Sequence, residues 1–373
     1  MVEECAALPV QDKMLQDKML SVCIPTHDGR GGTLRDALES VVSQLDETLK
    51  HQIEICISDN ASQDETRSVV EQYSQKYPSL IRYRRNPENL GFTRNLMQVV
   101  GLSQARFCWL LSSDDALAPH ALSRVLQVLA EHPGLSGMTI GVQACDRSLT
   151  PIAHAEPAPS LLPKNPAEPH LYTAPAQIFR ECGSVMGYTS AQIFDRALWQ
   201  ECLREMTPEK FNSFAYFPYL YLFGKMVRNK PLWLWLPEKL ALGRADNDYL
   251  SFHLSANMLK YHRLTMEELS QVWGALFGRN SATYRNLMRD NYINFWSGPA
   301  ILNYKLRTFS TAAEEWQALF WFPRRLYFLP SFWLAALPVL LTPHLLVQGT
   351  AALVRNLKMQ NALRAVKRRF FPA

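Results

Sequence analysis

The sequence feature that most constrains the fold is a short apolar run, Phe107–Leu111, that ends abruptly in Ser112, Ser113, Asp114 and Asp115. An apolar run of this length, bounded by polar residues, is typical of a strand buried on both faces of a parallel sheet. In open α/β sheets, ligands bind just beyond the carboxyl ends of the strands. Adjacent carboxylates repel each other there, and Mg²⁺ that carries a phosphate would relieve the repulsion. The alternative is an Asp–Asp turn before a helix.

The first half of the chain alternates between predicted strands and predicted helices at short intervals. The predicted strands are 19–26, 53–58, 81–85, 105–111 and 138–142, and helices are expected between them. This alternation predicts a mostly parallel sheet with right-handed crossovers. The polar groups at three strand ends, 26–28, 58–60 and 113–115, would then meet at one edge of the sheet.

Two common nucleotide-binding motifs are missing from the loop after the first predicted strand. The strand ends at Pro25, and the loop reads Thr26, His27, Asp28, Gly29, Arg30, Gly31 and Gly32. A dinucleotide-binding fold would need Gly-x-Gly-x-x-Gly at this point, and a Walker loop is absent as well. Neither oxidoreductase nor P-loop chemistry fits the sequence.

Four ordered segments of this half resemble the pattern of family 2 glycosyltransferases, which are GT-A enzymes that use nucleotide sugars. They are residues 20–26 (LSVCIPT), 57–62 (ISDNAS), 89–95 (NLGFTRN) and 111–115 (LSSDD). The resemblance covers about residues 19–145. It implies an α/β, Rossmann-like GT-A fold, in which a mostly parallel sheet is flanked by helices.

The resemblance also implies roles for single residues in binding the nucleotide sugar. Pro25, Thr26 and Asp28 would line the nucleotide pocket. Asp59 would accept a hydrogen bond from the base, and Arg94 would reach the diphosphate or order its loop.

A divalent metal, Mg²⁺ or Mn²⁺, is implied at the two aspartates. Asp115, together with Asp114, would hold the metal on the donor diphosphate, and Asp114 would also contact the nucleotide sugar. The usual Asp-x-Asp of the family would need an Asp at position 113, where this chain has Ser113. A cation at this position would neutralise the charge that builds on the leaving group.

The general base is harder to find in the acceptor half, residues 146–249. The segment after a predicted strand, Arg244 to Asp248, resembles abequosyltransferase-like enzymes of bacterial surface polysaccharide synthesis. An inverting transferase needs a carboxylate to deprotonate the acceptor hydroxyl, and Asp246 or Asp248 could provide it. Turn residues with local hydrogen bonds are an equally good interpretation. Glu209 is a further candidate, and the stereochemical course stays open.

The remaining chain predicts a helical extension, residues 250–322, and a membrane-associating tail, residues 323–373. Residues 326–347 hold no Asp, Glu, Lys or Arg but are interrupted by three prolines, which predicts a broken apolar hairpin. Residues 324–373 contain eight basic and no acidic side chains, and 358–370 have the pattern of a basic amphipathic helix. This combination favours an anionic membrane surface over nucleic acid. A docked core helix or a homo-oligomer contact is the alternative.

Together these patterns predict a glycosyltransferase at the cytoplasmic face of the inner membrane, peripheral or monotopic. The donor would be a nucleotide sugar, and the glycan acceptor would be linked to a polyprenyl diphosphate. Seven cysteines without metal-type spacing and the mixed polar residues 1–18 favour the cytoplasm. A GT-A-like nucleotidyltransferase and a non-catalytic nucleotide-sugar-binding scaffold are the alternatives.

Overall fold

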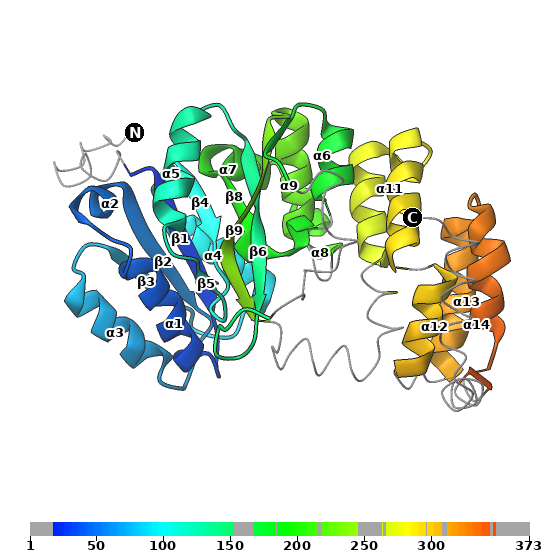
Figure 1. Cartoon of the computed structure of the whole chain (residues 1–373), viewed down its shortest axis with the longest axis horizontal. Coiled ribbons are helices and arrows are strands. Elements are labelled where there is room, and N and C mark those ends of the chain that lie inside the picture. The colour runs from blue at the N-terminus through cyan, green and yellow to red at the C-terminus, as the bar shows by residue number, and fades with distance from the viewer. Residues whose placement is uncertain are drawn as a thin grey trace, which may run out of the picture. The chain divides into compact units, whose positions relative to one another are not determined.

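The computed structural model describes residues 18–152, 167–183, 185–214, 218–244, 263, 266–295, 297–307, 312–343 and 346–347. The chain divides into two compact units, residues 1–247 and residues 248–373 (Figure 1). Within the described ranges, no helix has both the length and the apolar character needed to cross a bilayer.

The first unit is built on one nine-stranded sheet in the order β3-β2-β1-β4-β8-β6-β9-β5, with β7 paired to β9. The strands β1, β2, β3 and β4 are parallel neighbours. The strand bounds are β1 Leu20–Thr26, β2 Ile53–Asp59, β3 Ile81–Arg85, β4 Phe107–Leu110, β5 Ala116–Leu117, β6 Gly137–Cys145, β7 His170–Tyr172, β8 Gln192–Asp195 and β9 Trp233–Arg244.

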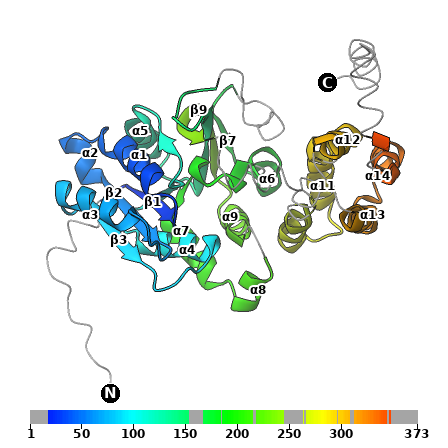
Figure 2. The ribbon, with the colours of Figure 1, turned by 90° about the horizontal axis from the view of Figure 1, so that it is seen from below.

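Helices cover both faces of this sheet (Figures 1 and 2). Every residue of β1, β2 and β4 is buried, as a strand between two helical layers must be. Helix α4 packs on β1 and β2, α1 packs on α3, and α7 packs on α9. The helices are α1 Gly31–Val42, α2 Glu47–Gln52, α3 Thr66–Lys76, α4 Phe92–Leu102, α5 Ala121–Glu131, α6 Pro175–Cys182, α7 Arg196–Arg204, α8 Pro208–Asn212 and α9 Pro218–Asn229.

The predicted alternation and the mostly parallel sheet are confirmed, but two predicted stretches differ. The sequence of residues 186–194 predicts one strand, but most of it consists of two 3-10 turns, Val185–Gly187 and Thr189–Ala191, and only β8 is extended. The sequence also predicts two strands, 232–236 and 240–243, on either side of Pro237. They are one strand, β9, because its partner β6 tolerates a shift of register at Gly141. A Cβ at position 141 would collide with the carbonyl oxygen of Pro237, so only glycine leaves room for the bulge.

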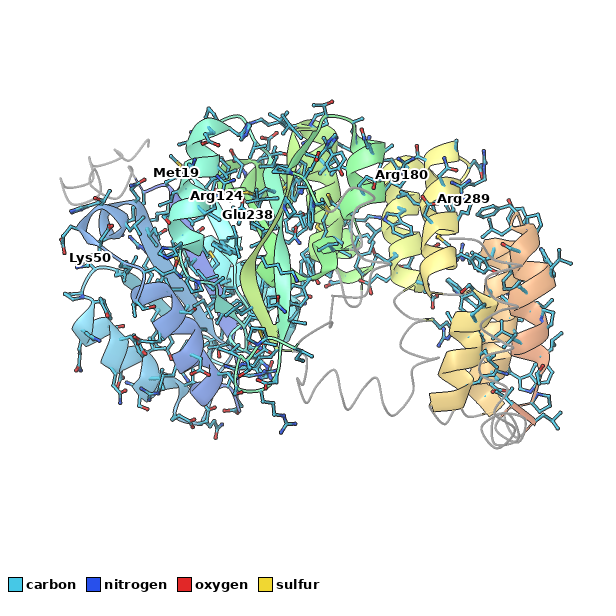
Figure 3. The ribbon with its side chains drawn as sticks, in the orientation of Figure 1. Met19, Lys50, Arg124, Arg180, Glu238 and Arg289 are labelled. Carbon is cyan, nitrogen blue, oxygen red and sulfur yellow. The ribbon has the colours of Figure 1, made fainter. Side chains whose placement is uncertain are left out.

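An ion pair fastens this bulge to helix α5. The Nη2 of Arg124 lies 2.7 Å from Oε1 of Glu238, next to Pro237 (Figure 3). Both side chains are partly exposed, so this contact contributes little to stability.

The second unit is helical in its described part. Residues 266–277 form a helix, followed by α11 Ala282–Phe295, α12 Gly298–Arg307, α13 Ala312–Leu326, a π-helix Phe332–Ala336 and α14 Leu337–Leu341. The predicted interruption of the apolar segment is observed at two of the three prolines, because α13 ends before Pro330 and α14 ends before Pro343, whereas Pro338 lies inside α14 and does not interrupt it. The predicted basic amphipathic helix at 358–370 lies outside the described residues.

Candidate active site at the carboxyl edge of the sheet

The carboxyl ends of β1, β2 and β4 lie together because the three strands are parallel and in close register. Thr26 pairs with Asp59, and Cys23 pairs with Leu110. The segments that follow these strands therefore emerge at one edge, which we call the carboxyl edge. The three polar clusters predicted from the sequence meet there.

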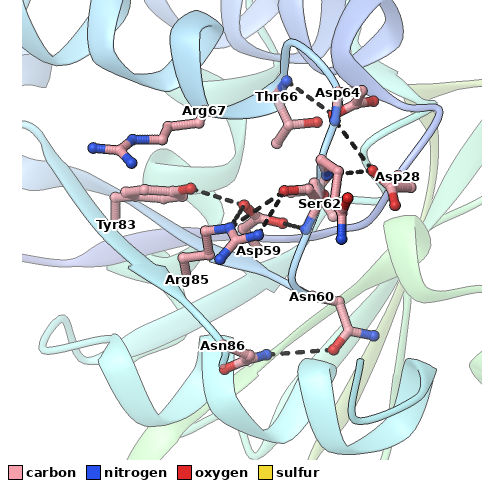
Figure 4. Close-up of polar contacts among 12 residues, drawn as sticks. Asp28, Asp59, Asn60, Ser62, Asp64, Thr66, Arg67, Tyr83, Arg85 and Asn86 are labelled. Carbon is pink, nitrogen blue, oxygen red and sulfur yellow. Dashed lines mark hydrogen bonds and ion pairs between the residues drawn. The ribbon is translucent and has the colours of Figure 1, made fainter. Parts of the chain in front are cut away.

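The first cluster surrounds Asp59, whose side chain is completely buried (Figure 4). Its Oδ1 accepts a hydrogen bond from the Ser62 amide at 2.9 Å, and its Oδ2 accepts one from the Tyr83 hydroxyl at 2.8 Å. Arg85 Nε lies 3.7 Å from the same Oδ2. Burial, together with the bond to Asp59, raises the pKa of Tyr83 well above its usual value, so Tyr83 remains a donor. These contacts fix the direction of the Asp59 carboxylate.

The second cluster clamps the loop after β1 to the loop after β2. Asp28 Oδ1 accepts from the amides of Gln63 at 2.5 Å and Asp64 at 3.2 Å. In return, Asp64 Oδ2 accepts from the Gly29 amide at 2.8 Å. Burial acts to raise the pKa of Asp64, but its hydrogen bonds outweigh burial and lower it. Pro25 and Thr26 are buried beneath, and Thr26 Oγ1 has no hydrogen-bond partner within the part of the chain that the structure describes.

Helix α4 reaches the same edge through Asn95. Its Nδ2 donates to the carbonyl oxygens of Thr26 and Ser58, each at 3.0 Å, and its Oδ1 accepts from the Ser58 hydroxyl at 2.7 Å. Asn95 therefore joins the ends of β1 and β2 to the start of α4. The neighbouring Arg94 side chain is exposed.

The third cluster is the turn after β4, where Asp114 and Asp115 are each 4% exposed. Asp115 Oδ2 accepts from the Tyr188 hydroxyl at 2.8 Å and the Ser190 hydroxyl at 2.5 Å. Its Oδ1 accepts from the Arg244 amide at 3.1 Å. Burial first, and then the charge of Asp114, raises the pKa of Asp115 to about 7. Burial therefore makes the charged form of Asp115 costly at this position.

Asp114 has partners of a different kind. Its Oδ2 is 2.7 Å from Arg30 Nη1, on the loop after β1, and its Oδ1 accepts from Ser112. Arg244, the last residue of β9, donates from Nε to the Asp114 carbonyl at 2.6 Å and also pairs with Asp36 on α1. Two arginines from opposite ends of the first unit therefore border the two aspartates.

Most of the first unit matches a known protein family. Residues 21–198 match the family model described as glycosyl transferase family 2. They form a family 2 glycosyltransferase domain. All three clusters of the carboxyl edge, except Arg244, fall inside the matched residues.

Curated relatives match only part of the chain. The abequosyltransferase RfbV of Salmonella typhimurium is 39% identical over 132 residues, which are 35% of this chain and 37% of the relative. The uncharacterized protein Rv1520 of Mycobacterium tuberculosis is 30% identical over 101 residues, 27% of this chain and 28% of the relative. The chain thus spans 37% of the length of the first of these relatives and 28% of the second.

Solved structures resemble the chain over most of its length. TarS of S. aureus, residues 1–349 in complex with UDP, has a TM-score of 0.57 at 14% identity, over 84% of this chain and 81% of TarS. The mannosyltransferase PcManGT of Pyrobaculum calidifontis, in complex with GDP-Man and Mn²⁺, has a TM-score of 0.52 at 14% identity. The match covers 95% of this chain and 88% of PcManGT. At this identity the likeness shows the GT-A fold alone.

The glycosyltransferase domain offers a cation few ready-made ligands. In the described ranges, no three or more His, Cys, Asp or Glu side chains converge on one point. Asp115 accepts from two hydroxyls and a backbone amide, and Asp114 pairs with Arg30 and accepts from Ser112. Mg²⁺ usually takes one or two carboxylates and completes its shell with phosphates and water. The two adjacent, buried carboxylates fit such a cation.

Sequence reasoning missed several residues of this edge. Arg30, Tyr83, Tyr188 and Ser190 contact the predicted aspartates, but each lies 24 to 84 residues away along the chain. No local pattern identifies such partners. The predicted bases Asp246 and Asp248 lie outside the described residues, and Glu209 is an exposed residue in the first turn of α8.

Proposed function

We propose that this protein transfers a sugar from a nucleotide-sugar donor to a glycan acceptor. The observation that carries the proposal is the carboxyl edge, where three polar clusters of a family 2 glycosyltransferase domain meet. The complexes of TarS with UDP and of PcManGT with GDP-Man, which share the fold, support a nucleotide-sugar donor.

Each cluster would bind a different part of the nucleotide-sugar donor. Asp59, fixed by Ser62 and Tyr83, would accept a hydrogen bond from the base. The clamped loop with Pro25, Thr26 and Asp28 would line the nucleotide pocket, and the exposed Arg94 would reach the diphosphate. Since these groups are held by bonds within the fold, little ordering is required when the donor binds.

We propose that Asp114 and Asp115 hold Mg²⁺ or Mn²⁺ against the donor diphosphate. The cation would stabilise the negative charge that develops on the leaving nucleotide. Arg30 and Arg244 border the same aspartates and keep positive charge at this end of the site.

We propose Asp246 or Asp248 as the group that deprotonates the acceptor hydroxyl. The end of β9 supports this proposal, because Arg244 contacts both Asp114 and Asp115 and Asp246 follows two residues later in the sequence.

The acceptor we propose is a growing surface glycan linked to a polyprenyl diphosphate. The similarity of 132 residues to the abequosyltransferase RfbV supports a sugar acceptor of this class. A lipid-linked acceptor would place the enzyme at the cytoplasmic face of the inner membrane.

Isothermal titration calorimetry with UDP-, CDP-, GDP- and dTDP-linked sugars, with and without Mn²⁺, tests the proposal. One donor class should bind, and Asp59→Asn should weaken it roughly 10- to 150-fold, the value of one hydrogen bond to a charged group. Asp290→Asn on α11, an Asp outside the carboxyl edge, is the matched control and should bind normally. Absence of binding to every donor would refute the proposal.

A further inference from the structure

The second unit has exposed aromatic side chains at helix positions that are usually occupied by polar residues. On α13, Ala318 and Phe322 are buried, whereas Trp316 is 73% and Phe320 is 65% exposed. The two pairs are each spaced by four residues and are offset by two, so they occupy opposite sides of the helix. Helix α13 is therefore apolar on both sides, a pattern typical of a helix with a second contact surface.

Two further aromatic residues extend this surface beyond the end of α13. Tyr327, seven residues after Phe320, is 68% exposed. Trp333 donates from Nε1 to the Tyr327 carbonyl at 3.0 Å, which holds its 43% exposed ring beside Tyr327. We call Trp316, Phe320, Tyr327 and Trp333 the aromatic face. A grouped apolar surface of this kind marks an interaction site.

The charge beside the aromatic face is positive. The guanidinium carbon of Arg324 lies 3.7 Å from the centroid of the Phe320 ring. The same helix also contains Glu314 and Glu315, of which Glu315 pairs with the buried Lys305 at 3.3 Å. From residue 324 to residue 373 the sequence has eight basic and no acidic side chains. The partner of this face should therefore be apolar and negatively charged.

We propose that the aromatic face lies on an anionic lipid surface. Trp and Tyr rings favour the boundary between headgroups and acyl chains, where their apolar ring is buried and their polar atom stays hydrated. Arg324 and the basic residues that follow it would attract anionic headgroups. A second copy of the chain would instead bring the same positive charges together, which disfavours a dimer through this face.

Co-sedimentation of the full-length protein with vesicles tests this proposal. The protein should bind vesicles of phosphatidylglycerol and phosphatidylcholine and bind pure phosphatidylcholine much less. The triple variant Trp316→Ser, Phe320→Ser, Tyr327→Ser should lower the partition coefficient roughly tenfold or more, because the buried apolar area is lost. Arg324→Glu should weaken binding to anionic vesicles alone, and less so at high salt. Leu171→Ser, at an exposed leucine of the first unit, is the control and should bind normally.

Three results would overturn the proposal. The first is that the wild-type protein does not bind anionic vesicles. The second is that the triple variant binds them as well as the wild type does. The third is that the wild type forms a dimer that the triple substitution abolishes, while neither protein binds vesicles. The substituted side chains are exposed, and circular dichroism melts would verify that each variant is folded. Nucleotide affinity, measured on the same samples, should not change, so failure of this proposal is distinguishable from failure of the proposed donor binding.

Discussion

Glu54 is a buried carboxylate in β2 that joins the four parallel strands. Its Oε1 accepts from the Ser21 hydroxyl at 2.6 Å and from the amides of Gln104 at 2.6 Å and Ala105 at 3.0 Å. Its Oε2 accepts from Arg82 Nε at 2.9 Å. These donors lie on β1, on β3 and in the segment before β4. We therefore expect Glu54 to stabilise the half of the sheet that carries the donor site.

The substitution Glu54→Gln separates the charge of this side chain from its shape. Glutamine keeps a carbonyl oxygen for three of the four donors but turns an amide group toward Arg82. A hydrogen bond to a charged group contributes about 1.5–3 kcal/mol, so we expect the free energy of unfolding to fall by about 2–3 kcal/mol. Glu54→Ala, which leaves every donor without its partner, should cost about 3–5 kcal/mol.

The effect of Glu54→Gln should depend on pH. Burial acts to raise the pKa of Glu54, but the bonds from Ser21, Gln104 and Ala105 and the charge of Arg82 outweigh burial and lower it. The folded-state pKa is therefore below the unfolded-state pKa. For such a group, the stabilisation is complete above the unfolded-state pKa and is lost as the pH falls through the folded-state pKa. The difference between wild type and variant should thus be largest at neutral pH and shrink on acidification.

Urea unfolding followed by circular dichroism, from neutral pH down to about pH 2, measures this difference. Glu88→Gln, at an exposed glutamate between β3 and α4, is the matched control and should change stability little at any pH. If Glu54→Gln costs less than about 0.5 kcal/mol, or if its cost is the same at every pH, Glu54 does not stabilise the sheet as an ionised acceptor.

Two further substitutions test the packing of each unit. Lys305 is buried in the second unit and donates to the carbonyls of Leu340 and Thr342, each at 2.8 Å. Lys305→Met should lower the free energy of unfolding by about 3–5 kcal/mol, because these acceptors and Glu315 lose a buried charge. Hydrogen exchange should then rise in α12 and α14 but not in β1. Unchanged exchange would refute the stabilising role of Lys305. Gly137→Ala should lower the melting temperature at a cost of about 1–3 kcal/mol, because its Cβ would lie 2.5 Å from the Trp233 ring. Gly101→Ala on α4, where the Cβ meets nothing within 4 Å, is the control and should not destabilise; equal melting of all three proteins would contradict the predicted clash.

The elements that could be predicted from the sequence are those with a local pattern. The run Phe107–Leu111 predicted β4 and the turn after it because burial on both faces leaves no polar position within the strand. The parallel order of the strands then placed Asp28, Asp59 and Asp114 at one edge, without knowledge of any contact. Strand β9 was divided at Pro237 because a proline inside an apolar run normally ends a strand, and the compensating glycine lies on another strand.

The partners of the predicted residues could not be predicted, because they depend on the tertiary fold. Arg244 and Asp36 are 208 residues apart, and Glu54 and Ala105 are 51 residues apart. Any of the chain's 39 basic side chains could have met these carboxylates. Sequence spacing identifies which strand ends share an edge, whereas the choice of partner depends on how later elements return to that edge.

The return of β9 to the carboxyl edge connects the two halves of the glycosyltransferase domain. Asp115 accepts from Tyr188 and Ser190, which precede β8, and from the amide of Arg244, which ends β9. All three donors belong to the predicted acceptor half, whereas Asp115 follows a strand of the nucleotide half. A displacement of β9 would therefore remove a donor from a buried carboxylate whose pKa is already raised by burial. The hydrogen bonds of Asp115 thus couple the position of β9 to the turn after β4 that carries the two aspartates.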